Sequence, residues 1–140
     1  MKVLVDTPIW SLALRRKKEN LSPEEKIIVA EFIELIREAR GLITGPIRQE
    51  VLSGISSIEQ FEKLKRKLKA FDDLPVTTGD YELAAEFYNR CRKKGIQGSH
   101  IDFLLCAVSK RNGIPVFTTD KDFNFYSQHI DVALHVPRVH

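Results

Sequence analysis

Apolar and polar positions along this chain form blocks that predict short buried strands between amphipathic helices. Short apolar runs within 2–5, 41–44 and 114–117 are typical of strands that are covered on both faces. Two weaker strand signals lie at Pro75-Val76 and at 132–136. Apolar residues recur at helical spacing in the stretches 8–14, 23–41, 46–54, 58–71, 78–95 and 99–113.

Several of the expected helices begin at residues that favour a helix start. Ser22 to Glu25 combine an N-cap serine, a proline at the first helical position and a glutamate three residues after the cap. Ser99 is expected to cap the helix that follows it, and Thr78 or Asp80 the helix before that. The alternation of strands and helices predicts an α/β fold, with a central mainly parallel sheet in a single domain over residues 1–140.

Composition agrees with an ordinary globular protein. Apolar residues make up 43% and charged residues 29% of the 140 residues, which argues against a disordered chain. The apolar start of the chain is interrupted by Asp6, and the longest apolar run, Phe103 to Val108, is too short to span a bilayer. Cys91 and Cys106 occupy apolar helical positions without metal-ligand spacing, so we expect reduced core residues in a cytoplasmic protein.

Four acidic residues each follow an apolar run or begin a helix, and these are Asp6, Glu50, Asp102 and Asp120. The first and the last come directly after predicted strands. The second lies about one turn into the helix after the second strand, and the third lies in the first turn of its helix. Because the carboxyl ends of parallel strands form the ligand-binding edge of such a sheet, we expect these carboxylates to gather there.

Carboxylates that gather in this way repel one another. Two unit charges ~4 Å apart repel by about 4 kcal/mol at an effective dielectric constant near 20, so the group needs protonation or a cation. Ligation by oxygen atoms alone suits Mg²⁺ or Mn²⁺ better than zinc. Such a cation activates water and stabilises the leaving oxygen of a phosphodiester. The pattern therefore predicts metal-dependent phosphodiester hydrolysis.

Each acidic residue also has a simpler explanation. Asp6 can be a strand-ending or capping residue, Glu50 a solvated helix residue, and Asp102 a partner of the helix dipole. Asp120 with Asp122 can form a turn or cap the short segment after it. The combination of all four is harder to explain in this way than any one of them.

Basic residues are unevenly distributed, although the formal net charge is only +3. They cluster at 15–18, 63–69, 90–94 and 110–111. Any one cluster is best explained as a solvated helix face. All of them beside an acidic cation site favour a polyanionic substrate.

The acidic segments, taken in chain order, resemble the motifs of the PIN-domain family, and more narrowly those of its VapC-type toxins. Val5-Asp6-Thr7 is similar to the first acidic motif, and 45–54 is similar to the second. Asp102 ahead of the apolar run 104–108 resembles the third. The segment 118–123 resembles the Thr-x-Asp-x-Asp-Phe ending of the family and is the most specific of these matches.

The resemblance implies a three-layer α/β/α PIN-like fold and a ribonuclease that depends on Mg²⁺ or Mn²⁺. The residues that it assigns to the metal or to the attacking water are Asp6, Glu50, Asp102 and Asp120. Asp122 matches a less regular acidic position, and the hydroxyl groups of Thr7 and Thr118 are expected beside the metal. The resemblance further implies an RNA substrate, a homodimer and a VapB-like antitoxin that covers the acidic pocket. From the shortness of the apolar runs we expect no membrane association.

The chain departs from the family pattern around its third motif. Bulky residues at 103–106 replace smaller ones, and Ser99-His100 replaces the common apolar-proline lead. His100 either reaches an RNA phosphate or is an exposed residue without a role. Trp10 either stacks on a base or anchors the core or an interface.

Other classes of protein remain to be weighed. A haloacid-dehalogenase-type phosphatase needs a second aspartate two residues after the first, where this chain has Pro8. A receiver domain needs a phosphoacceptor aspartate at the end of a middle strand, and the sequence does not offer one. Two alternatives stay within the PIN family, namely an RNA-processing nuclease outside a toxin system and an inactive scaffold that binds RNA or a partner. The intact acidic positions favour catalysis over the scaffold.

Overall fold

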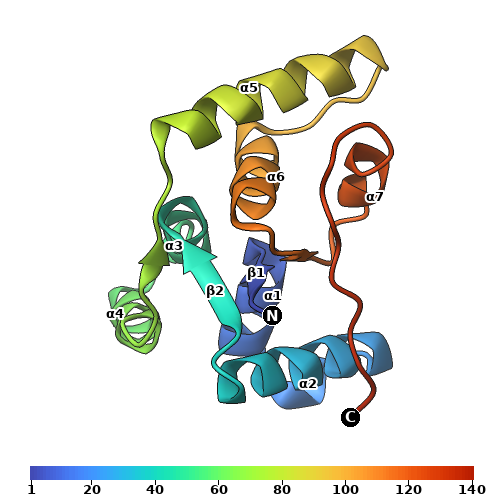
Figure 1. Cartoon of the computed structure of the whole chain (residues 1–140). Coiled ribbons are helices and arrows are strands. Elements are labelled where there is room, and N and C mark those ends of the chain that lie inside the picture. Colours follow the sequence, from blue (N-terminus) through green and yellow to red (C-terminus); the bar gives the residue numbers. More distant parts are fainter.

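Four short strands form one parallel sheet at the centre of the molecule (Figure 1). In the computed structural model, which describes residues 1–140, they are β1 (Val3–Val5), β2 (Gly41–Thr44), β3 (Asp73–Leu74) and β4 (Val116–Phe117). Their order across the sheet is β3-β2-β1-β4, and every pairing is parallel. Leu4 of β1 pairs with Leu42 on one side and with Val116 on the other. The carboxyl ends of the strands therefore share one edge of the sheet.

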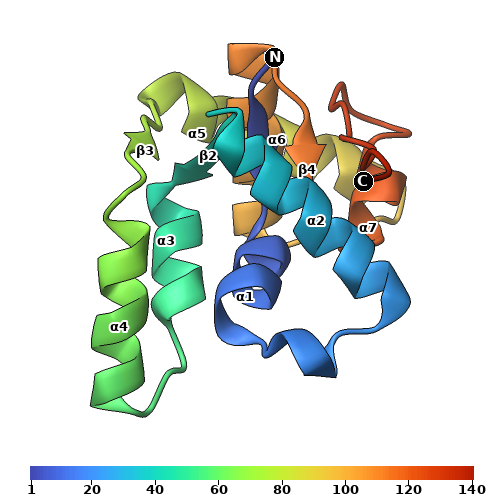
Figure 2. The same cartoon turned by 90° about the horizontal axis from the view of Figure 1, so that it is seen from below.

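Helices cover both faces of this sheet, as Figures 1 and 2 show. They are α1 (Thr7–Arg15), η1 (Lys18–Asn20, a 3₁₀ turn), α2 (Pro23–Arg37), α3 (Gly45–Leu52), α4 (Ile58–Leu68), α5 (Thr78–Lys93), α6 (His100–Asn112) and α7 (Asp122–Tyr126). The pair α5 and α6 lies on one side of the sheet, and α1 and α2 lie on the other. The predicted three-layer α/β/α fold with a parallel sheet is confirmed.

Apolar strands and one tryptophan form the middle of the core. All three residues of β1 are completely buried, as their uninterrupted apolar run predicts. Trp10 is also fully buried, and its indole N–H donates to the backbone oxygen of Val5 at 3.0 Å. Its ring contacts Phe32 and Phe71 edge-on, with centroids 5.0 and 4.9 Å away. Of the two interpretations of Trp10, the core anchor is confirmed.

Three helix starts show how well local signals predicted the boundaries. The capping box at Ser22 forms as expected, and the Ser99 hydroxyl accepts a hydrogen bond from the backbone N–H of Asp102 at 3.0 Å. The prediction for α5 was wrong by one residue, because the cap is Thr77. The Thr77 N–H donates to the carboxylate of Asp80 at 2.8 Å, which makes Asp80 the third residue of the capping box and not the cap.

Both weak strand predictions were wrong. The strand expected at Pro75-Val76 lies at Asp73–Leu74, because a proline has no N–H to donate to a neighbouring strand. No strand forms at 132–136. Val116 and Leu134 make only an isolated bridge there, and the chain then leaves the sheet for α2 (Figure 1).

The C-terminal segment is held against α2 by a buried carboxylate, that of Glu31. His135 and His140 lie 2.7 and 2.8 Å from its oxygens, and the Arg138 guanidinium donates to it at 3.0 Å. Burial alone would raise the pKa of Glu31, but the hydrogen bonds from Arg138, His140 and His135 prevail and lower it to about 2. This carboxylate is therefore ionised and paired in the folded chain.

The two cysteines are structural. Cys91 and Cys106 are both buried and unpaired, which confirms the sequence-based expectation of free core thiols. Burial is the main cause that raises the pKa of each thiol, so neither is a reactive thiolate.

The chain contains no helix that is both long enough and apolar enough to cross a membrane.

Candidate functional site

Asp6 lies at the junction of β1 and α1, on the carboxyl edge of the sheet. Its backbone N–H donates to the carbonyl of Phe117 at 2.9 Å, which extends the β1–β4 pairing by one residue. One carboxylate oxygen accepts the backbone N–H of Thr7 at 2.8 Å and so caps α1. The other accepts the hydroxyl of Thr118 at 2.7 Å. The side chain is thus held in place from the ends of two neighbouring strands.

The surroundings of Asp6 disfavour its charge. Only 5% of the residue is exposed, and this burial raises the pKa of Asp6 to about 6. The hydrogen bonds from Thr118 and Thr7 oppose that shift, while the negative charges of Asp102 and Glu50 add to it. A buried carboxylate with a raised pKa and like charges nearby is typical of a functional site.

Asp102 occupies the third position of α6, near the same edge. One of its carboxylate oxygens accepts the hydroxyl of Tyr126 at 2.7 Å. Burial is the main cause that raises the pKa of Asp102, and the charges of Asp120 and Glu50 raise it further. The Tyr126 hydrogen bond acts in the opposite direction and favours the charged form. His100, two residues earlier, is exposed and its ring stacks on Tyr88.

Tyr126 is a site residue that the sequence analysis did not identify. It is fully buried at the end of α7 and donates its hydroxyl to Asp102 across 24 residues of chain. Gly98 makes this approach possible, because a Cβ on Gly98 would lie 2.6 Å from the Tyr126 oxygen and 2.7 Å from the Phe103 ring. A glycine directly before the Ser99 cap was the one available signal of such close packing.

Thr118 connects Asp6 to the segment that follows β4. Its hydroxyl donates to Asp6 and accepts the backbone N–H of Asp120 at 3.0 Å. Asp120 in turn accepts the backbone N–H of Asp122 at 2.9 Å, so part of its acceptor capacity stabilises a turn. Asp122 is exposed at the start of α7. The turn that offered a simpler explanation for Asp120 and Asp122 is therefore present.

Glu50 projects from α3 and is exposed. Its charge affects both Asp6 and Asp102, and the charge of Asp120 affects Asp102, so these carboxylates lie within electrostatic range of one another. They do not form a closed set, because no three His, Cys, Asp or Glu side chains come near enough together to hold a metal ion. The structure brings the predicted residues to one edge without closing them around a single point.

The donor groups at this edge match a hard divalent cation in their chemistry. They are carboxylate and hydroxyl oxygens, which Mg²⁺ and Mn²⁺ prefer. The Thr7 and Thr44 hydroxyls, beside the ends of β1 and β2, are buried without any hydrogen-bond partner. Buried hydroxyls are rarely left unpaired, so both indicate an edge that is completed by water or a bound group. The raised pKa values of Asp6 and Asp102 also fit a site where a positive charge is needed.

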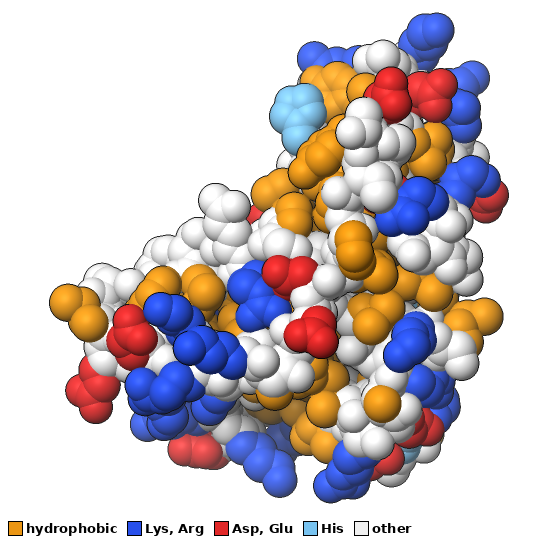
Figure 3. Space-filling view, turned by 60° about the vertical axis from the view of Figure 1, so that its left-hand side comes forward, with side chains coloured by type: hydrophobic (Ala, Val, Ile, Leu, Met, Phe, Trp, Pro, Cys, Tyr) orange, Lys and Arg blue, Asp and Glu red, His pale blue; other side chains and the backbone are white.

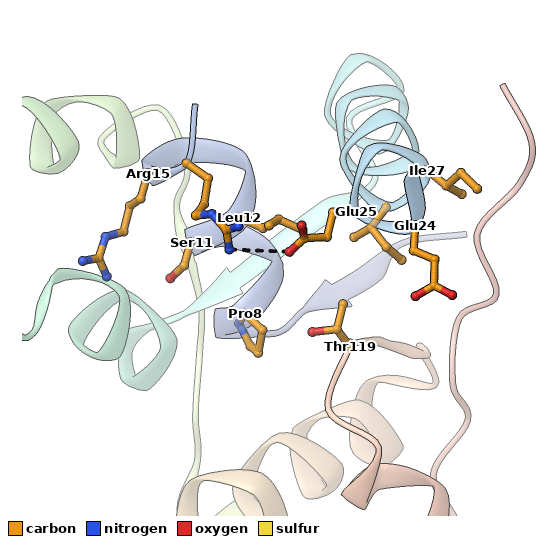
Figure 4. A pocket seen from close by; sticks show the side chains of 10 residues that line it. Pro8, Ser11, Leu12, Arg15, Glu24, Glu25, Ile27 and Thr119 are labelled. Carbon is orange, nitrogen blue, oxygen red and sulfur yellow. Dashed lines mark hydrogen bonds and ion pairs between the residues drawn. The ribbon is translucent and has the colours of Figure 1, made fainter. Parts of the chain in front are cut away.

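A groove of about 740 Å³ runs between α1 and α2 next to this edge (Figure 4). Thr119, from the loop after β4, and Pro8 line its end nearest to Asp6 and Asp120. None of the acidic candidates lines the groove itself. Arg16 reaches Glu25 of α2 across it, whereas Arg15 points away from α2.

Comparison with curated protein sequences returns no significant match. Solved structures with the same fold include FitAcB from Neisseria gonorrhoeae, with a TM-score of 0.75 and 20% identity over 96% of this chain and 97% of that chain. VapBC2 from Rickettsia felis, bound to a DNA fragment from their promoter, has a TM-score of 0.73 and 14% identity over 96% of this chain and 98% of that chain. VapBC-5 from Mycobacterium tuberculosis, a member of the VapBC family of toxin–antitoxin systems, has a TM-score of 0.63 and 17% identity over 99% of this chain and 100% of that chain.

At these identities the likeness concerns the fold. The family model described as PIN domain, however, matches residues 3–127, which include every acidic residue discussed above and Tyr126. The chain therefore belongs to the PIN-domain family.

Proposed function

We propose that this PIN domain is a metal-dependent endoribonuclease, and that it is the toxin of a VapBC-type toxin–antitoxin pair. The observation that carries the proposal is the state of Asp6. It is a nearly buried carboxylate at the carboxyl edge of the sheet, its pKa is raised to about 6, and the charges of Asp102 and Glu50 contribute to that shift. Such an arrangement is unfavourable for folding alone and is explained by a cation that binds there.

The residues that would hold Mg²⁺ or Mn²⁺ are Asp6, Glu50, Asp102 and Asp120, with Asp122 within reach of the turn that it shares with Asp120. When bound, the cation supplies charge for the phosphate oxygens and lowers the pKa of a water molecule. Thr118 fixes the orientation of Asp6, and Tyr126 fixes that of Asp102. Held in this way, Asp102 would bind the cation or position the attacking water.

The partners follow from the same proposal. The substrate is RNA, the active species is a homodimer in the cytoplasm, and a VapB-like antitoxin covers the acidic edge. The support for the antitoxin is that solved structures with the same fold include FitAcB, VapBC2 and VapBC-5. Residues 1–140 act as a single domain. A PIN nuclease that processes RNA outside a toxin system would share the chemistry without the antitoxin.

An inactive PIN scaffold is the second candidate. The open arrangement of the carboxylates favours it, because no three of them close around one point. A scaffold that binds RNA or a partner has no need for a cation. The two candidates therefore differ in one measurable property, which is cleavage that depends on a divalent ion.

The test is an RNA-cleavage assay on purified protein with Mg²⁺, with Mn²⁺ and with excess chelator. We expect cleavage with either ion, none in chelator, and none for Asp6→Asn or Asp102→Asn, both of which should remain folded. Wild-type cleavage that persists in chelator would rule out the metal mechanism. The toxin assignment has its own test, in which expression of the chain alone arrests growth and the product of an adjacent gene restores it. If growth is not arrested, or is not restored, the toxin assignment is wrong, whereas the nuclease assignment is unaffected.

A further inference from the structure

A second groove, of about 350 Å³, lies between the end of α1 and α4. Its polar lining consists of four cationic side chains and one amide, from Arg15, Lys17, Lys63, Lys67 and Gln60. Its apolar lining comes from Leu14, Ile55 and Leu64, and no acidic residue lines it. We call this the α1–α4 groove. Figure 3 shows the accompanying surface, where Lys and Arg side chains gather low on the left, at the height of α4.

The four cations of the α1–α4 groove have no carboxylate partner. Nearby basic residues do, since Arg16 pairs with Glu25 at 3.5 Å and Lys65 approaches Glu62 to 4.0 Å. Like charges that face one concavity raise its potential and favour a bound anion. All four cations that line the groove are thus free of an ion pair within the chain.

The α1–α4 groove adjoins the groove between α1 and α2 at Arg15. This residue lines both the α1–α4 groove and the groove between α1 and α2, whose other end is formed by Pro8 and Thr119. Thr119 lies between Thr118, which holds Asp6, and Asp120. From Pro8 to Arg15 the axis of α1 rises by about 10 Å. A chain that leaves the acidic edge along α1 therefore reaches the cations within a short distance.

We propose that the α1–α4 groove binds the phosphate backbone of the RNA on one side of the bond that is cut. The inference rests on the proposed ribonuclease function and adds to it the path of the substrate. Three of the four cations are lysines, which act as point charges on flexible stems and do not need a fixed partner geometry. The groove is therefore built to hold phosphates in any sequence, and its apolar floor offers a surface to the bases.

An acidic protein segment is the competing occupant. A folded or extended peptide is held mainly by apolar anchors or by backbone pairing along a strand edge. The α1–α4 groove has no strand in its lining, and its cations come from the end of α1, from Lys17 just after it and from α4. A flexible polyanion with a charge on every unit fits that layout better, and the experiment below separates the two.

The experiment compares wild-type protein with Lys63→Gln/Lys67→Gln, measuring anisotropy of a labelled single-stranded RNA in chelator over a range of salt concentrations. Because a single strand contributes a slope of about 0.7 per phosphate contact, the plot of log K against log salt should become shallower by about 1.4. At ~0.1 M salt the affinity should fall by about 10- to 30-fold. The loss should be uniform across RNA sequences. Arg15→Gln alone should give about half of the slope change.

The matched control is Lys93→Gln/Lys94→Gln, which removes the same charge at the far end of α5 and should keep the wild-type slope. Equal slopes for both double variants would overturn the proposal. Polyglutamate binding that depends on Lys63 and Lys67, with no RNA binding, would overturn it in favour of an acidic protein partner. If RNA binds through the groove but is never cut with Mg²⁺, the catalytic proposal fails and the groove assignment stands. If RNA is cut with Mg²⁺ but the slopes are equal, the groove assignment fails and the catalytic proposal stands.

Discussion

Replacement of Asp6 by asparagine should abolish cleavage and at the same time stabilise the fold. The pKa of Asp6 rises from its usual 3.8 to about 6, mainly because the carboxylate is buried. Each unit of pKa corresponds to ~1.36 kcal/mol, so ionised Asp6 costs the folded state on the order of 3 kcal/mol. Asparagine keeps the shape, and its amide can still accept from Thr7 and pair with the Thr118 hydroxyl. We expect a net gain of about 1–3 kcal/mol for the variant.

The pH dependence of this effect has a definite sign. Because the pKa of Asp6 is higher in the folded state than in the unfolded state, its stabilising contribution is complete below about pH 4. That contribution is lost as the pH rises through about 6. Wild type and Asp6→Asn should therefore have similar free energies of unfolding near pH 4. The gap between them should open between about pH 4 and 6 and stay constant above it.

The assay is denaturant and thermal unfolding in chelator between about pH 4 and 8. The expected gain of about 1–3 kcal/mol corresponds to roughly 3–10 °C in Tm for a chain of this size. Asp72→Asn is the control, since Asp72 is exposed and its replacement should change stability by less than about 0.5 kcal/mol. An Asp6→Asn variant that is less stable than wild type near pH 8, or a gap that does not depend on pH, would refute the reasoning.

Three further changes test other parts of the structure. Tyr126→Phe should raise the pKa of Asp102, because it removes a hydrogen bond to the charged form; the acid limb of the cleavage pH profile should then move to higher pH, and an unchanged profile would contradict this. Gly98→Ala should cost about 1–3 kcal/mol in unfolding experiments, since the added methyl group meets the Tyr126 hydroxyl at 2.6 Å; a neutral effect would show that the two rings move aside freely. Glu31→Gln should lower the free energy of unfolding by about 2–3 kcal/mol at neutral pH. The difference from wild type should shrink as the pH falls from about 4 towards the Glu31 pKa of about 2, because the wild type then loses this stabilisation. Equal stability of the two proteins near pH 7 would contradict the pairing with Arg138.

Local signals predicted the parts of the fold that depend on neighbours in sequence. The run Val3–Val5 is wholly apolar because both faces of β1 are covered, and the structure leaves all three residues fully buried. The Ser22 box predicted the start of α2, because its two reciprocal hydrogen bonds join residues only three apart. Asp6 directly follows β1 in sequence, so its position at the carboxyl edge of the sheet could also be predicted.

Contacts between distant segments had no such signal. Tyr126 reaches Asp102 only because α7 folds back over α6, which no periodicity encodes. A glutamate in a helix ordinarily faces solvent, yet the structure buries Glu31 completely under partners more than 100 residues away. The segment 132–136 predicted a strand, but after a single bridge to β4 the chain continues to Arg138, which pairs with Glu31. Such features depend on the assembled fold.

The carboxylates at the strand ends are proposed to bind a divalent cation together. Calorimetric titration of purified protein with Mn²⁺ tests this most directly, with Asp6→Asn, Asp102→Asn and the Asp72→Asn control measured in parallel. We predict saturable binding for wild type and Asp72→Asn, and loss of that binding in each of the other two, although both remain folded. Binding that is unchanged in Asp6→Asn and Asp102→Asn, or no saturable binding by wild-type protein, would contradict the claim.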